Sequence, residues 1–209
     1  MAHNTVKILV TARLNLKSHP IKMVINRGLK NYLRLGGVIA YATDSCFGLG
    51  CDPRSRLGLQ RILRIKGRPQ HKGVIIIGAD QTQLTPYFAP LNTAQQNLLN
   101  STWNNPKTDA KPHTWLVPAA RSCPPWLTGK FNTIAARVTQ HKASRALCQH
   151  LNMALVSTSA NKSGCKSAKT SRECYKLFNK HVRVIHGLIG IQRRPSTIQD
   201  LMTNKIIRA

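Results

Sequence analysis

The sequence predicts an α/β fold in which helices cover a mixed β-sheet. Three observations carry this prediction. First, the chain contains short apolar runs bounded by glycine, which are typical of buried strands. Second, these runs alternate with segments of helical periodicity. Third, no linker divides the 209 residues. We therefore expect one domain over residues 21–209, preceded by a short basic extension over residues 1–20.

Glycine, proline and capping residues indicate where the predicted helices begin and end. Gly36-Gly37 stops the first helix, Asp52 is the expected N-cap of the second helix, and Pro69 is expected to end it. In chain order we predict a helix from about 21 to 35, a strand over 38–41, a helix over 52–68, a strand over 74–77, a loop with a short helix over 92–112, strands over 115–117 and 134–138, a helix over 143–151, a strand over 154–156, a loop over 157–171, a helix over 172–180, a strand over 182–189 and a last strand near Ile206.

The composition and the net charge favour some classes of function and argue against others. The 32 Lys and Arg residues against 6 Asp and Glu give a net charge of +26, which favours a polyanionic partner such as nucleic acid, a nucleotide or anionic lipid. A basic background without function is the alternative. So few acids argue against a hydrolase with paired carboxylates. No apolar run is long enough for a membrane span, and the N-terminus has no secretory signal, so we expect a cytoplasmic protein.

The six cysteines show no paired spacing of the kind that binds metals. We expect reduced thiols and no metal held by protein side chains. The chain also contains no Walker A sequence, no G-x-S-x-G elbow and no H-E-x-x-H pair.

Two polar segments are candidates for binding a phosphate. Lys66-Gly67-Arg68-Pro69 puts two cations at the end of a helix, where a point charge and a guanidinium fork suit a polyphosphate. Ser157 to Gly164, with the sequence STSANKSG, follows a buried strand, and ligands collect at such strand ends. The alternatives are a solvated surface pair for the first segment and a self-satisfied turn for the second.

A third segment, Tyr41 to Gly50, also follows a buried strand, and its glycines permit close approach of a ligand. In this order and at these separations, the three segments resemble the short bacterial form of the YrdC/TsaC family, the threonylcarbamoyl-AMP synthases. Pro112-His113-Thr114, Ala136-Arg137-Val138 and Pro195 to Ile198 extend the resemblance. It implies a twisted mixed sheet with a concave, basic ligand-binding surface.

The resemblance also implies the reaction. Such a synthase joins L-threonine, bicarbonate or CO2, and ATP into threonylcarbamoyl-AMP and pyrophosphate, for N6-threonylcarbamoyladenosine at position 37 of tRNAs that read ANN codons. Mg2+ would be bound through the ATP phosphates. The implied partners are tRNA or other RNA and the tRNA threonylcarbamoyl-transferase machinery.

By the same resemblance, Lys66 and Arg68 are the expected catalytic residues. The residues expected to bind ATP are Lys66, Arg68, Lys72, Thr133, Ser157, Ser159 and Asn161. The residues expected to bind threonine are Thr43, Arg137, Ser196 and Thr197, with Arg137 pairing with the carboxylate.

The chain departs from the family pattern in three places. Ala42 stands where the family has proline, W-P-G-P is broken over residues 103–112, and the glycine-rich stretch before the last motif is replaced by residues 190–194. These departures and the high charge leave a second hypothesis open: an RNA-binding module of this fold without synthase activity. A carbamoyl-transfer maturation factor would need acylphosphatase and zinc-finger segments, which this chain lacks.

Overall fold

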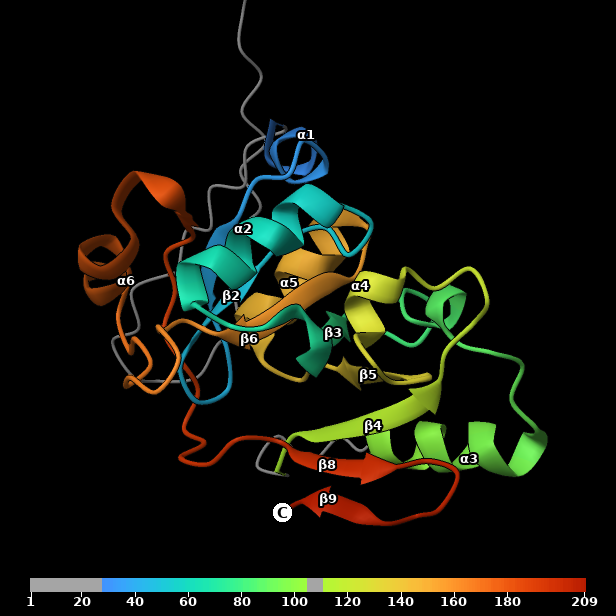
Figure 1. The fold of residues 1–209 in the computed structure, drawn as a ribbon. Coiled ribbons are helices and arrows are strands. Elements are labelled where there is room, and N and C mark those ends of the chain that lie inside the picture. The colour runs from blue at the N-terminus through green and yellow to red at the C-terminus, as the bar shows by residue number, and fades with distance from the viewer. Residues whose placement is uncertain (1–27, 105–110) are drawn as a thin grey trace, which may run out of the picture.

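The computed structural model describes residues 28–104 and 111–209, where nine strands form one mixed sheet with helices packed on it (Figure 1). The predicted α/β class is therefore confirmed. In chain order the elements are α1 (Gly28–Arg34), β1 (Ile39–Ala42), β2 (Phe47–Gly50), α2 (Arg56–Lys66), η1 (Gln70–Lys72), β3 (Ile75–Gly78), η2 (Thr85–Tyr87), α3 (Thr93–Trp103), β4 (His113–Pro118), α4 (Pro125–Thr128), β5 (Thr133–Val138), α5 (Lys142–Leu151), β6 (Leu155–Ser159), α6 (Ser171–Phe178), η3 (Asn179–His181), β7 (Arg183–Val184), β8 (Thr197–Asp200) and β9 (Ile206–Arg208).

The strand order across the sheet is β7-β1-β2-β6-β3-β5-β4-β8-β9. β1 with β7, β3 with β5 and β4 with β8 are parallel pairs, and the other neighbours are antiparallel. This arrangement brings the first and last thirds of the chain to the same sheet. β9 lies at one edge, next to the C-terminus (Figure 1).

Side chains alternate across the sheet, so each face has its own core. On one face, Ile39 and Tyr41 of β1 pack in a cluster with buried residues of α1 and α5. On the other face, Ala40 and Ala42 belong to a cluster that contains the buried residues of α2, α3 and α6. Short apolar strands covered on both faces explain why the sequence shows continuous apolar runs rather than alternation.

The second helix begins later and ends earlier than predicted. Ser55, not Asp52, is the N-cap, and its hydroxyl accepts from Gly58 N at 3.1 Å. The buried carboxylate of Asp52 instead accepts from Arg54 N in the preceding turn. Gly67 ends the helix with φ of 60°, a left-handed conformation that favours glycine, so Pro69 lies beyond the end.

The polar stretch after Asn92 holds more helix than its composition suggested. α3 is eleven residues long and begins with a capping box between Asn92 and Gln95. Only Leu99 and Trp103 of this helix are buried, which explains the weak apolar pattern. Residues 105–110, within the altered W-P-G-P segment, lie outside the described residues, as do residues 1–20 and the start of the first predicted helix.

Two strand predictions need correction, and two strands were missed. β6 continues to Ser159, because Ser159 pairs with Gly48 of β2, so the predicted loop begins later. The strand predicted over 182–189 is reduced to β7, and a strand-free segment follows it. β2 and β8 were missed, because two glycines weaken the apolar pattern of β2, and β8 is polar and only half-buried.

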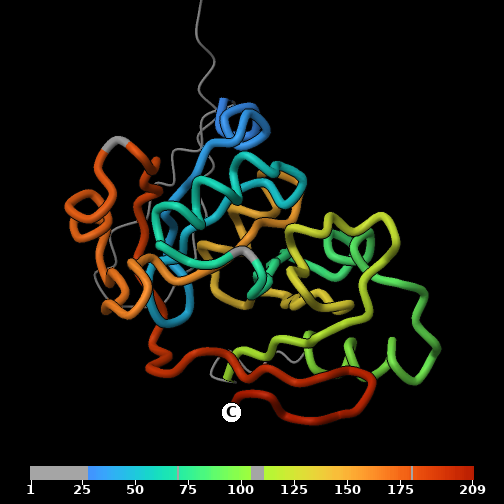
Figure 2. Tube along the Cα trace, viewed as in Figure 1, coloured from blue at the N-terminus to red at the C-terminus, as the bar shows by residue number. Residues whose placement is uncertain are grey.

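The segment after β7 follows the loop between β1 and β2 instead of continuing the sheet (Figure 2). Gly190 N donates to Thr43 O at 2.9 Å, and Gln192 N donates to Asp44 O at 3.1 Å. A Cβ atom at Gly190 would lie 2.7 Å from Asp44 O, so the close approach requires glycine there. We call residues 185–196 the strap.

Candidate active site

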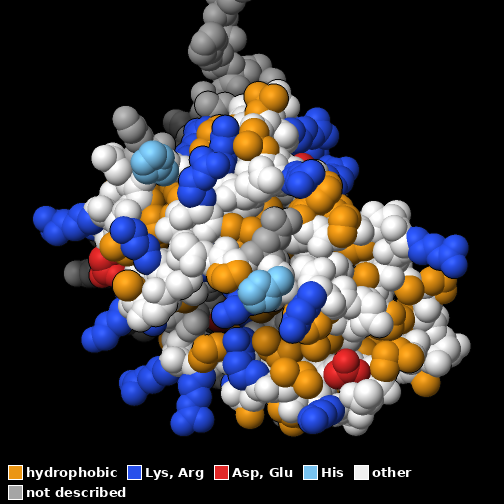
Figure 3. Space-filling model, in the orientation of Figure 1, with side chains coloured by type: hydrophobic (Ala, Val, Ile, Leu, Met, Phe, Trp, Pro, Cys, Tyr) orange, Lys and Arg blue, Asp and Glu red, His pale blue; other side chains and the backbone are white. Residues whose placement is uncertain are grey.

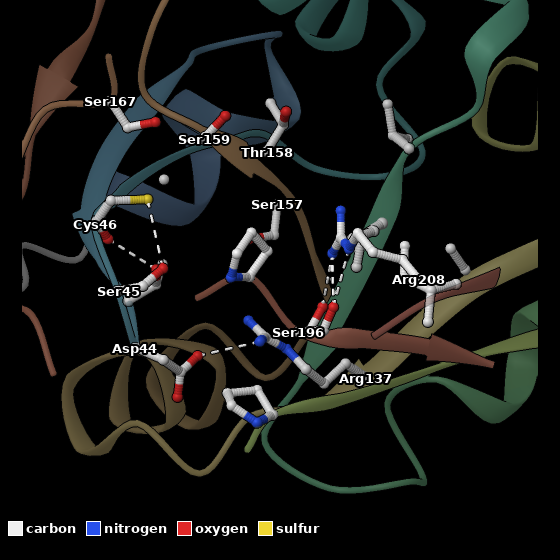
Figure 4. A pocket seen from close by; sticks show the side chains of 18 of the residues that line it. Asp44, Ser45, Cys46, Arg137, Ser157, Thr158, Ser159, Ser167, Ser196 and Arg208 are labelled. Atoms are coloured by element: carbon white, nitrogen blue, oxygen red, sulfur yellow. Dashed lines mark hydrogen bonds and ion pairs between the residues drawn. The ribbon is translucent and has the colours of Figure 1, made fainter. Parts of the chain in front are cut away.

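A cavity of about 980 Å³ opens between the loop that joins β1 to β2, the strands β5 and β6, the strap and the β8–β9 hairpin (Figure 4). Most of the predicted site residues meet in it, although they come from all parts of the chain. Those that line it are Thr43, Arg68, Lys72, Thr133, Arg137, Ser157, Ser159 and Ser196. Lys66, Asn161 and Thr197 do not line it.

The pleat of β5 explains how one strand serves both core and cavity. Ile134 and Ala136 are fully buried in the core, whereas Thr133, Ala135 and Arg137 face the cavity. β6 ends in polar residues beside the cavity, where Ser157, Thr158 and Ser159 all contribute to the wall (Figure 4).

Lys66 is the last residue of α2 and only 4% exposed. Its ammonium donates to the carbonyl oxygens of Ser159 at 2.6 Å and Asn161 at 3.0 Å, and to Asn161 Oδ1 at 3.0 Å. These contacts use all three of its N–H donors. Burial, together with the neighbouring Arg68, lowers the pKa of Lys66 to about 8. Hydrogen bonds from Lys66 therefore connect the K-x-R motif directly to the S-x-N motif, and Lys66 itself does not line the cavity.

Asn161 is also occupied within that turn. Its Oδ1 accepts from Ser159 Oγ at 2.6 Å, and its Nδ2 donates to the carbonyl oxygens of Lys162 and Cys165. Arg68 in contrast reaches the cavity, held by a 2.9 Å hydrogen bond to Gly73 O, while its buried Nε has no hydrogen-bond partner among the described residues. Burial lowers the pKa of Arg68.

Arg137 forms an ion pair with Asp44 in the wall of the cavity. Arg137 Nη1 lies 3.1 Å from Asp44 Oδ2, and the side chains are 11% and 14% exposed (Figure 4). Neither the Oδ2 atom nor Arg137 Nε makes a hydrogen bond to any described residue.

Ser196 lies in a polar cluster with Thr114, which the sequence analysis named only as part of the resemblance, and with Arg208, which it did not name. Thr114 Oγ1 donates to its hydroxyl at 2.9 Å, and Arg208 donates twice to its carbonyl oxygen and once to its hydroxyl. Thr197 belongs to β8, where it pairs with His113. Arg208 was missed because it lies ten residues beyond the last recognisable motif, in a three-residue edge strand.

The cavity is strongly cationic. Among the described residues, eight cations line it: Arg68, Lys72, Arg137, Lys166, Lys169, Arg193, Arg194 and Arg208. Two carboxylates, those of Asp44 and Glu173, line it as well. Figure 3 shows the same imbalance on the surface, where Lys and Arg are spread widely and acidic side chains are few.

The described residues contain no cluster of side chains suited to binding a metal ion. No group of three His, Cys, Asp or Glu residues among the described ones is placed to hold a metal ion, and the six cysteines are unpaired. Within residues 28–104 and 111–209, no helix has the length and apolar character that a membrane crossing requires.

The fold and the cavity together define an α/β protein with a cationic ligand cavity at the ends of its strands. The chain belongs to the Sua5, YciO and YrdC family, whose model, described as "Telomere recombination", matches residues 31–209.

Its relatives include two bacterial proteins named threonylcarbamoyl-AMP synthase. The protein from Methylobacillus flagellatus is 50% identical over 87% of this chain and 98% of its own length. The protein from Thiobacillus denitrificans is 50% identical over 87% of this chain and 94% of its own length.

Two solved structures share the fold. Escherichia coli YciO has a TM-score of 0.69 and 27% identity, covering 86% of this chain and 85% of that chain. P. abyssi Sua5, solved in complex with L-threonine, has a TM-score of 0.68 and 25% identity over 82% of this chain. This chain spans about half of that Sua5 chain, 49%.

Proposed function

We propose that this protein is a threonylcarbamoyl-AMP synthase, which makes threonylcarbamoyl-AMP and pyrophosphate from L-threonine, bicarbonate or CO2, and ATP for the threonylcarbamoylation of tRNA. Over 87% of this chain, half of the aligned residues are identical to those of two proteins with that name, and the match covers 98% and 94% of their length. The observation that carries the proposal is the cavity, which gathers most of the residues expected for both substrates although they are distant in sequence.

The nucleotide side is assigned to the turn after β6 and the segment after α2. Figure 4 places Thr158, Ser159 and Ser167 along one side of the cavity. Arg68 and Lys72 are the cations for the phosphates, while Ser157, Ser159 and Thr133 offer hydroxyl groups. Lys66 and Asn161 support this side from behind, because the structure commits their polar atoms to the turn.

The threonine side is assigned to the opposite wall, where Figure 4 places Asp44, Arg137 and Ser196. Arg137 offers a guanidinium to the substrate carboxylate, and Thr43 and Ser196 flank it. Thr197 supports this side through its strand rather than its side chain.

The chemistry follows from this division. The amine of threonine and CO2 form a carbamate, and a carbamate oxygen attacks the α-phosphorus of ATP, releasing pyrophosphate. The cavity has to hold three ligands together and neutralise phosphate charge, which is positioning and electrostatic work without a side-chain nucleophile. Mg2+ would be bound through the phosphates, because Asp44 is paired with Arg137 and Glu173 accepts from Lys169 N.

The proposal also names partners. The net charge of +26 supports contact with tRNA, and the adenylate would pass to the tRNA threonylcarbamoyl-transferase machinery.

Three expectations from the sequence stay predictions: the cytoplasm as the compartment, the extension over residues 1–20 and the domain boundary at residue 21.

The test is release of pyrophosphate from ATP, measured with threonine and bicarbonate together and with each omitted. Release that requires both supports the synthase, and Arg68→Ala should remove most of it, because a charge-assisted contact to phosphate is lost. RNA binding without pyrophosphate release would instead support the RNA-binding module, which the high charge favours.

A further inference from the structure

The strap is fixed to the rest of the protein on both sides of a short free span. On the side toward β7, Gly190 N and Gln192 N donate to the backbone of the loop between β1 and β2 (Figure 2). On the side toward β8, Ser196 O accepts two hydrogen bonds from Arg208, at 3.1 and 2.8 Å. Residues 193–195 lie between these anchors, and all three are exposed and line the cavity. This span therefore lies where the cavity opens to solvent.

The two arginines of the span have no partner in the part of the protein that the structure describes. The side chains of Arg193 and Arg194 make no hydrogen bond or ion pair there, and their backbone amides donate to no acceptor there. Other arginines of the cavity are held in place: Arg68 donates to Gly73 O at 2.9 Å, and Arg208 donates to Ser196. The protein itself therefore does not position the guanidinium groups of the span.

The carboxylates of the cavity are engaged elsewhere. Asp44 pairs with Arg137, and Glu173 Oε2 accepts from Lys169 N at 2.7 Å. Two neighbouring guanidinium groups repel each other, and each of them matches the geometry of a phosphate group. A chain of phosphates in the cavity would supply negative charge to both arginines of the span.

A span of this kind can change conformation while its anchors stay in place. Its amides and side chains lack the hydrogen bonds that fix the rest of the strap, so little holds it in one conformation. Contacts between phosphates and the two guanidinium groups exist only in the bound state, so they favour the conformation in which the span covers the ligand. Closure of such a segment over an active site excludes water from the reaction.

We propose that residues 193–195 act as a lid, which closes over the cavity when a polyphosphate is bound because Arg193 and Arg194 are attracted to its negative charge. The inference rests on the proposed function, because ATP is taken as the source of the polyphosphate. Closure keeps water away from the reactive adenylate. The departure of pyrophosphate then removes the charge that holds the lid closed, whereas AMP, which has one phosphate, leaves the lid open.

Hydrogen exchange measured by mass spectrometry tests closure directly. In the free protein, the amides of Arg193 and Arg194 should exchange rapidly and those of Gly190 and Gln192 slowly, because only the latter two donate to backbone oxygens. The ligand is α,β-methylene-ATP, in which the bond that the reaction breaks is blocked. At saturation it should slow exchange at Arg193 and Arg194 about tenfold or more, as a lid closed in about 90% of the complexes requires. Saturating AMP should leave exchange there unchanged.

Three results would contradict the lid. Unchanged exchange at Arg193 and Arg194 with the analogue bound would overturn the inference and leave the proposed function standing. Equal slowing by AMP would also overturn it, because closure would then not depend on the phosphates that leave as pyrophosphate. An analogue that does not bind, as isothermal titration calorimetry would show, would refute the proposed function and the lid with it.

A double variant, Arg193→Gln with Arg194→Gln, removes both charges of the lid. It should weaken binding of α,β-methylene-ATP roughly 10- to 100-fold, because charge-assisted contacts to phosphate are lost. It should leave the affinity for AMP unchanged and abolish the slowing of exchange at positions 193 and 194. The matched control is Arg145→Gln with Arg172→Gln, which removes the same charge from two exposed arginines that do not line the cavity.

The control variant should keep both the affinity for the analogue and the slowing of exchange. Equal weakening by the two double variants would mean that the net charge of the surface, and not the lid, decides the affinity. An unchanged affinity and unchanged slowing in the lid variant would mean that Arg193 and Arg194 have no part in closure. Either result overturns the inference. Circular dichroism of both variants checks that they are folded.

Discussion

Arg137 shows how one side chain can link two elements. Its strand, β5, turns it toward the cavity, and Asp44 from the loop between β1 and β2 holds one of its nitrogens. Arg137 also lines the cavity, where we propose that it binds the carboxylate of threonine. A lysine at this position would keep the charge but could not reach both partners with a planar fork.

We therefore expect Arg137→Lys to raise the KM for threonine about tenfold or more and to change the KM for ATP much less. The two values come from pyrophosphate release with each substrate titrated separately. An equal loss for both substrates, or a loss confined to ATP, would remove Arg137 from the threonine site.

Lys66 supports a pH-dependence prediction. Its pKa is lowered from its ordinary 10.5 to about 8, with burial the larger cause and Arg68 the second. Above pH 8 the folded protein loses this proton, and a neutral amine has two donors for its three acceptors. The turn carrying Ser159 should loosen, so the affinity for a non-hydrolysable ATP analogue should fall as the pH rises through about 8.

The controls separate Lys66 from the other cations. Lys72→Gln should weaken the analogue at every pH but keep the decline near pH 8, whereas Lys66→Arg should abolish the decline, because arginine stays protonated. Stability should change in the opposite direction. Between pH 8 and 10.5 the unfolded chain binds more protons at this residue than the folded one, so its contribution to the free energy of unfolding rises with pH.

Among the elements, the segment after α2 depends on a contact between two turns. Gly129 ends α4 with φ of 65°, and a Cβ atom there would lie 2.4 Å from His71 O. Lys130 N donates to the same oxygen, so α4 holds η1 in place. η1 in turn precedes Gly73, whose carbonyl oxygen holds Arg68.

Gly129→Ala should lower the free energy of unfolding by about 2 kcal/mol or more, because a strained backbone and a clash with backbone add together. It should also weaken ATP binding through Arg68. Gly67→Ala is a control for positive φ without a clash, since φ is 60° there and no atom lies within 4 Å of the added Cβ, although its ψ of 38° strains an alanine less than the ψ of −125° at Gly129. Thermal unfolding compares the two, and an equal loss would mean that the contact with η1 contributes nothing.

For the whole molecule, the net charge of +26 predicts affinity for RNA. Neutralising Z phosphates releases counterions, so the logarithm of the RNA association constant should fall with the logarithm of salt at a slope of about −0.7Z to −0.9Z. Pyrophosphate release should depend on salt less, because its ionic contacts are few and partly buried. Filter binding beside the pyrophosphate assay, from about 50 to 300 mM salt, gives both curves. No RNA binding at the lowest salt would refute the contact with tRNA and leave the synthase proposal intact.

Local patterns predicted much of this fold. The apolar runs of β1, β3, β5 and the start of β6 and the periodicity of α5 come from burial on a sheet face or helix face, which leaves a direct signal in neighbouring residues. The segments carrying Arg68 and Ser157 were selected from their polar composition, those carrying Arg137 and Ser196 from the resemblance to a family, and all four residues line the cavity.

Tertiary contacts decided what local patterns could not. β2 and β8 are strands because distant partners complete their hydrogen bonds. The positions of Lys66 and Asp44 also depend on distant partners. Lys66 binds the turn at Ser159 and Asp44 pairs with Arg137, and each of these two contacts joins residues that are 93 positions apart in sequence. Sequence alone determined which side chains were available for chemistry. The packing of the sheet decided which of them face the ligand, because a side chain's direction and partners depend on long-range contacts that no local pattern records.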